Sequence, residues 1–220
     1  MTTSMPPDLR LRVLDATSRA PSPNRAEVRA RGLRAWGIGA ALTSIVFAAL
    51  GVSVGGRPVA FIVTTAVGWA VVAAVATFGA YGRGRSMLGR SRPLLWLVVA
   101  LTGPALLAWL LACLSVWPGA GVDPGNPLVH LACFTATMGL SVGPFATMLY
   151  IRRGADPVHP RIQGAALGAA AGSLGGVLID VHCAVAHPTH VVLAHVLPAL
   201  VLAAFGALLG ARTLAVRREP

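Results

Sequence analysis

Six stretches of 19 to 24 residues, each with at most one charged side chain, constrain this chain more than any other feature of its sequence. The hydrocarbon core of a bilayer takes about 20 residues of helix but only about 9–11 of a tilted strand. A spanning segment must also satisfy its own backbone hydrogen bonds, as helices and closed barrels do. The sequence therefore predicts an all-α polytopic membrane protein with transmembrane helices at 35–54, 58–80, 93–116, 128–151, 162–181 and 191–209.

The connections between these stretches are short, so consecutive helices are expected to run antiparallel in an up-down bundle. Composition agrees, because 55% of the residues are apolar, 11% are charged and the mean hydropathy is +0.72. An average soluble domain carries roughly 25% charged residues. These values exclude an ordinary soluble enzyme, and the apolar content excludes a disordered chain.

The arginines predict the orientation. Seventeen of the 18 basic residues, all of them Arg, fall in the N-terminal segment, in alternate connections or in the C-terminal tail, and Arg57 alone falls on the other side. Arginine-rich connections stay in the cytoplasm, so both termini are expected there. We interpret the net charge of +11 as a topology signal and expect no direct binding of nucleic acid.

The chain divides into an N-terminal segment (1–34), a transmembrane domain (35–211) and a short tail (212–220). In the first segment Leu9 and Val13 would share a helix face, with Leu14 beside it. A second helix from Asn24 would run into the first span. Two interpretations stay open for this segment: an anchor lying in the membrane interface, or a docking element for a soluble partner.

The fifth span carries a glycine at every fourth position. Small residues on one helix face let neighbouring backbones approach closely. Packing against helices of the same chain is the favoured interpretation, and a homodimer is the alternative. The residues are Gly164, Gly168, Gly172 and Gly176.

Cysteine and histidine gather at the non-cytoplasmic end of the predicted bundle, although hydropathy does not require it. That end holds Cys113, Cys133, Cys183 and every histidine except His159. Thiolate and imidazole bind zinc and copper, which makes Cys133, Cys183, His182 and His187 a possible site for a transient metal ion. Three interpretations of these cysteines and histidines stay open: buried packing residues, a disulfide or metal sensor, and catalysis. Catalysis is the least favoured of the three.

Other chemistry has no signature here. Phosphate-binding loops, nucleophile elbows and paired carboxylates within a span are missing from the sequence, so no enzyme activity and no stable cofactor are expected. The middle of each span also lacks an ionisable residue, which lowers the case for an ion-coupled transporter.

Several residues together resemble one family. They are the loop Arg152-Arg153-Gly154-Ala155-Asp156-Pro157, then Pro160, the glycine series and His182-Cys183. With six spans and a short N-terminal tail, the chain resembles the NrsF-type membrane anti-sigma factors. The resemblance implies an extracytoplasmic-function sigma factor as partner, the bacterial inner membrane as location, and functional thiols at Cys133 and Cys183.

The leading hypothesis is thus a regulator that holds a sigma factor and releases it on a periplasmic redox or metal signal. Signal sensing is assigned to Cys133, Cys183, His130 and His182. Partner binding is assigned to Leu9, Val13, Leu14, Arg152 and Arg153. The alternatives are a small membrane transporter and a membrane thiol or metal redox protein.

Overall fold

The computed structural model describes residues 25–52, 57–81, 91–118, 125–153 and 158–215. Their regular structure is helical throughout, without strands, and includes six helices long and apolar enough to cross a membrane. The elements are α2 (Arg25–Leu50), α3 (Val59–Tyr81), α4 (Arg92–Val116), α5 (Pro127–Ile151), α6 (Pro160–His182), α7 (Pro188–Val191), the π-helix η2 (Val192–Val196) and α8 (Leu197–Thr213). The predicted all-α fold with six long apolar helices is confirmed. Leu9, Val13 and Leu14 lie outside the described residues.

Prolines and a capping side chain set where several helices begin. Proline stands in the first turn of α4, α5 and α6, where its missing N–H has no helical acceptor to lose. Asn126 caps α5 by accepting a hydrogen bond from the Leu128 amide at 2.9 Å. The sequence predicts a helix from Asn24 that continues into the first span, and α2 runs without a break from Arg25 to Leu50.

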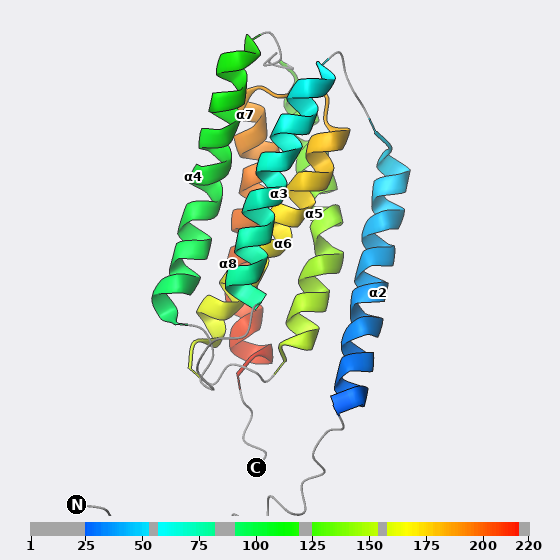
Figure 1. The fold of residues 1–220 in the computed structure, drawn as a ribbon, viewed down its shortest axis with the longest axis vertical. Coiled ribbons are helices and arrows are strands. Elements are labelled where there is room, and N and C mark those ends of the chain that lie inside the picture. Colours follow the sequence, from blue (N-terminus) through cyan, green and yellow to red (C-terminus); the bar gives the residue numbers. More distant parts are fainter. Residues whose placement is uncertain (1–24, 53–56, 82–90, 119–124, 154–157, 216–220) are drawn as a thin grey trace, which may run out of the picture. The chain divides into compact units, whose positions relative to one another are not determined.

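Helix α6 lies in the middle of the bundle, flanked by α3, α5 and α8 (Figure 1). It is the most buried of the six spans, and α8 is its closest neighbour. Gly164 lies against Gly206, Gly168 against Leu202 and Gly172 against Ala199, so one glycine face meets the α8 backbone. Gly176 lies instead against the Trp69 ring of α3. The glycine series is therefore occupied by helices of the same chain.

Replacing Gly168 with alanine is expected to destabilise the bundle by about 1–3 kcal/mol, the usual cost of overpacking. The added Cβ would overlap the Leu202 carbonyl, which is backbone and cannot rotate away. Gly37→Ala is the matched control, because nothing lies within 4 Å of a Cβ there. Unfolding of the purified protein in mixed micelles measures both variants, and equal stability of the two would contradict this packing.

Helix α2 contacts α5 through small and hydroxyl-bearing residues. Gly39 lies beside the Gly143 carbonyl, and the Thr43 hydroxyl donates to the Leu140 carbonyl at 3.4 Å. Further along, the Thr147 hydroxyl donates to the Ala35 carbonyl at 3.1 Å. These contacts bind the first span to the fourth although most of α2 is exposed.

The sixth span is not the single regular helix that its hydropathy predicts. It consists of α7, one π-turn (η2) and α8, and the Leu197 amide bonds to the Val192 carbonyl five residues back. Pro198 contributes, because it has no N–H to offer the Ala194 carbonyl. The Thr137 hydroxyl of α5 donates to that carbonyl instead, at 2.9 Å. Single π-turns of this kind occur frequently at functional sites.

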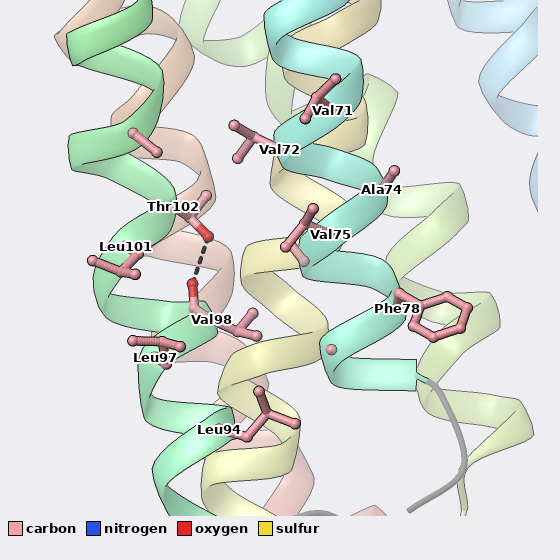
Figure 2. Close-up of a pocket in the computed structure, with 13 residues that line it drawn as sticks. Val71, Val72, Ala74, Val75, Phe78, Leu94, Leu97, Val98, Leu101 and Thr102 are labelled. Atoms are coloured by element: carbon pink, nitrogen blue, oxygen red, sulfur yellow. Dashed lines mark hydrogen bonds between the residues drawn. The ribbon is translucent and has the colours of Figure 1, made fainter.

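An apolar groove of about 670 Å³ lies between the second half of α3 and the first half of α4 (Figure 2). Valine, alanine and phenylalanine residues of α3 and leucine residues of α4 line it. The Thr102 hydroxyl at the groove donates to the Val98 carbonyl of its own helix at 2.6 Å. Such a lining suits lipid acyl chains, and the groove lies toward the opposite end of these helices from the cysteines and histidines.

Candidate functional site

Two thiols meet where α5 begins and α6 ends. The Sγ atoms of Cys133 and Cys183 are 3.6 Å apart, and both cysteines are free thiols. Cys133 lies in the second turn of α5, while Cys183 caps α6 with its amide bonded to the Ile179 carbonyl at 2.7 Å. Residues 50 positions apart are thus brought together by the antiparallel packing of α5 and α6.

Two histidines of the last span complete the cluster. His190 Nε2 lies 3.1 Å from Cys183 Sγ, and the rings of His190 and His195 meet edge to face with centroids 5.3 Å apart. The two are five residues apart, so they would point to different sides of a regular α-helix. The π-turn between them closes after five residues and brings both rings to the same side.

His130 supports this cluster from the first turn of α5. Its Nδ1 atom lies 2.8 Å from Nδ1 of His190, and the two rings stack at a tilt with centroids 4.9 Å apart. When the shared proton sits on His190 Nδ1, Nε2 of His190 keeps a free lone pair directed at Cys183. His130 thereby holds the orientation of His190.

Burial and hydrogen bonding shape the chemistry of Cys183. Its hydrogen bond with Cys133, followed by burial, raises the pKa of the Cys183 thiol above its ordinary value, although contact with His190 acts in the opposite direction. The Val185 amide donates to Cys183 Sγ at 3.4 Å. The sulfur is therefore protected from bulk water and already serves as an acceptor.

A buried ion pair lies beside this end of α6. Arg57 Nη1 is 3.9 Å from Asp180 Oδ1, with the two side chains 3% and 6% exposed. Arg57 also donates to the Asp180 carbonyl at 2.9 Å, and the Thr65 hydroxyl donates to the carboxylate at 2.8 Å. Sequence reasoning did not foresee this pairing. The signal was present, because Arg57 is the single arginine predicted for this end and Asp180 closes the fifth span.

The structure gathers some of the expected site residues and separates others. Cys133, Cys183 and His130 lie in one network. His182 does not join it, since its Nδ1 is 3.0 Å from the Gly51 carbonyl. His187 precedes α7 and is likewise outside the group of potential metal ligands, which is Cys133, Cys183, His190 and His195. The metal-ligand set drawn from the sequence is thus not the set that the fold brings together.

The remaining expected residues lie away from the thiol pair. Cys113 is buried near the end of α4 in a separate apolar cluster with Phe61 and Leu110. Arg152 and Arg153 follow α5 at its other end, and the Arg152 amide bonds back to the Met148 carbonyl. Arg152 and Arg153 therefore lie at the opposite end of α5 from Cys133, in the connection between α5 and α6.

The cluster supports two kinds of chemistry. Four ligand atoms, two sulfurs and two ring nitrogens, all lie within 4.8 Å of one another. Two thiols at this separation can be oxidised to a disulfide after a short movement, or can bind a thiophilic cation together with imidazole. Disulfide formation would draw the end of α6 toward the start of α5, whereas a shared cation would hold the two sulfurs near their present separation.

Comparison with known proteins gives the family. No curated protein and no solved structure matches the chain significantly. A family model described as NrsF, negative regulator of sigma F, matches residues 16–215, which takes in every described helix. The chain therefore belongs to the NrsF family of negative regulators of a sigma factor.

Proposed function

We propose that this protein is an inner-membrane anti-sigma factor for an extracytoplasmic-function sigma factor, and that a periplasmic signal acting on Cys133 and Cys183 releases the partner. The observation that carries the proposal is the 3.6 Å approach of the two thiols at one end of a membrane-spanning bundle. Membership in the NrsF family supports the sigma factor as partner.

The distribution of arginine supports the sidedness. The Cys/His cluster lies at the end that receives Arg57 alone, whereas the other connections and both terminal segments carry the remaining arginines. The charge of Arg57 is paired with Asp180. This end would face the oxidising periplasm, where thiol chemistry is an available signal, and residues 1–34 would face the cytoplasm with the sigma factor.

Helices α5 and α6 offer a route from signal to partner. They hold the two thiols at one end, and residues 152–159 join them at the other. Along their contact Gly175 packs against the small Ser141 side chain and the Thr137 carbonyl, so the two helices approach closely there. Movement at the thiol pair would be passed along two packed helices to the connection that contains Arg152 and Arg153.

Removing residues 1–22 is expected to make the sigma-dependent promoter constitutive while the six spans still insert. The deletion would remove Leu9 and Val13, which are proposed to lie in the sigma-factor interface. Leu9→Asp and Val13→Asp should each weaken repression, because a charge placed in an apolar interface is desolvated without a partner. A promoter reporter and membrane immunoblotting measure the effect.

The control for this experiment is Thr3→Asp, which adds the same charge to the same segment outside the proposed apolar face. It should leave repression intact. Full repression by the deletion variant at normal protein level would show that the tail does not hold the sigma factor.

A further inference from the structure

We propose that Cys133, Cys183, His190 and His195 form a tetrahedral site for Zn²⁺ or a similar thiophilic divalent cation, and that His130 positions His190 within it. The inference deepens the proposed function and rests on it only for the regulatory meaning of the site. Metal binding is tested on the purified protein and does not depend on the regulatory role.

The distances fit one shared ion. Zinc binds sulfur at about 2.3 Å and imidazole nitrogen at about 2.0–2.1 Å, so tetrahedral geometry places two sulfurs about 3.8 Å apart and a sulfur and a nitrogen about 3.6 Å apart. The two Sγ atoms are 3.6 Å apart, and Cys183 Sγ is 3.1 Å from His190 Nε2. The widest pair lies within 4.8 Å, so a contraction of about 1 Å would complete the tetrahedron.

His195 points independently to a ligand. Its side chain is 1% exposed, yet neither ring nitrogen has a hydrogen-bond partner among the described residues. An unpaired polar group buried in this way is unfavourable and rare in folded proteins. The ring is instead held toward the thiol pair, with Trp69 on one side and His190 on the other. A metal ion bound to one of these nitrogens would give the buried ring a partner that the fold does not supply.

Neighbouring groups make the supporting hydrogen bonds that metal ligands usually have. A ligating histidine commonly has its other ring nitrogen hydrogen-bonded, which fixes its tautomer and orientation. His130 provides that contact to His190 at 2.8 Å, and the Val185 amide donates to Cys183 Sγ. His130 is therefore a positioning residue rather than a ligand.

Charge balance favours a divalent ion in this buried place. Two thiolates and two neutral imidazoles carry a charge of −2, which a divalent cation neutralises. The two thiol protons leave to solvent as the ion enters, because the ligands bind in their deprotonated form. His190 is fully buried and Cys183 nearly so, and a neutral complex avoids the large cost of an unpaired buried charge.

The test uses the full-length protein, purified in detergent and reduced. Co²⁺ replaces Zn²⁺ as a spectroscopic probe, and a chromophoric chelator competes for Zn²⁺ to give the affinity. We expect one ion per chain, the visible d–d bands of tetrahedral Co²⁺, and a thiolate-to-cobalt charge-transfer band. An absence of Zn²⁺ and Co²⁺ binding by the reduced wild-type protein would overturn the proposal.

Variants separate ligands from neighbours. Cys183→Ser should remove most of the charge-transfer band, and His195→Ala should abolish the tetrahedral spectrum. His130→Phe should keep the spectrum and lower the Zn²⁺ affinity by about 10–100-fold, the usual effect of losing such a supporting contact. Cys113→Ser and His187→Ala are the controls and should bind as the wild type does. Binding that depends on His187 and not on His195 would also overturn the assignment.

A promoter reporter distinguishes the two proposals. If the reduced protein binds no metal while Cys133→Ser and Cys183→Ser abolish induction, the metal site is wrong and disulfide formation becomes the signal. If the metal site is present while both serine variants respond normally, the metal assignment stands and the proposed sensing role fails.

Discussion

Serine at position 133 or 183 is expected to abolish induction of the sigma-dependent promoter by thiol-reactive metals and oxidants, while basal repression stays intact. Serine keeps the size of the side chain but neither forms a disulfide nor binds soft cations as a thiolate does. Each variant breaks the same pair, whose sulfurs are 3.6 Å apart. Both single variants should therefore lose the whole response, and the double variant should lose no more.

The matched control is Cys113→Ser. Cys113 is also buried, 3% exposed, and lies near the same end of the bundle, but it is outside the Cys/His cluster. It should retain induction at normal protein level. Normal induction in both Cys133→Ser and Cys183→Ser would show that the two thiols are packing residues and that sensing occurs elsewhere.

Replacing Asp180 with alanine is expected to destabilise the protein by about 3–5 kcal/mol, the cost of leaving one partner of a buried ion pair without the other. Arg57, which is 5% exposed in the unmodified protein, would lose its carboxylate partner, and the Thr65 hydroxyl would lose its carboxylate acceptor. The change should lower the midpoint of unfolding in mixed micelles, followed by tryptophan fluorescence. Because Asp180 lies just before Cys183, metal binding should weaken in parallel.

Two further variants show whether the effect comes from the buried charge. Arg57→Leu combined with Asp180→Ala removes both charges and should recover most of the lost stability, since apolar replacements of buried pairs are often neutral. Glu27→Ala removes an exposed carboxylate from α2 and should change stability by less than about 0.5 kcal/mol. A loss below about 1 kcal/mol in Asp180→Ala would place the pair in contact with water, where such pairs contribute little.

The sequence by itself determined the six helices and their approximate ends. Spanning length, apolar composition and the need to satisfy the backbone leave few alternatives in a membrane, and each observed span overlaps its predicted stretch. Prolines at the starts of α4, α5 and α6 are local signals, readable without a partner helix. The gathering of cysteine and histidine at one end also followed, because alternating helices bring every second connection to the same side.

Tertiary structure alone decided which of those side chains meet. Five histidines were expected at that end, yet His182 contacts Gly51 while His190 and His195 join the thiols. That arrangement depends on the π-turn at Val192–Val196. Pro198 has no N–H to donate to the Ala194 carbonyl, and the Thr137 hydroxyl of α5 donates to that carbonyl instead. The hydropathy of the sequence does not indicate where a π-turn interrupts a span. The rotation of a helix about its axis depends on the helices packed against it. Here the contacts of Gly176 with Trp69 and of Asp180 with Arg57 hold the rotation of α6 beside the site.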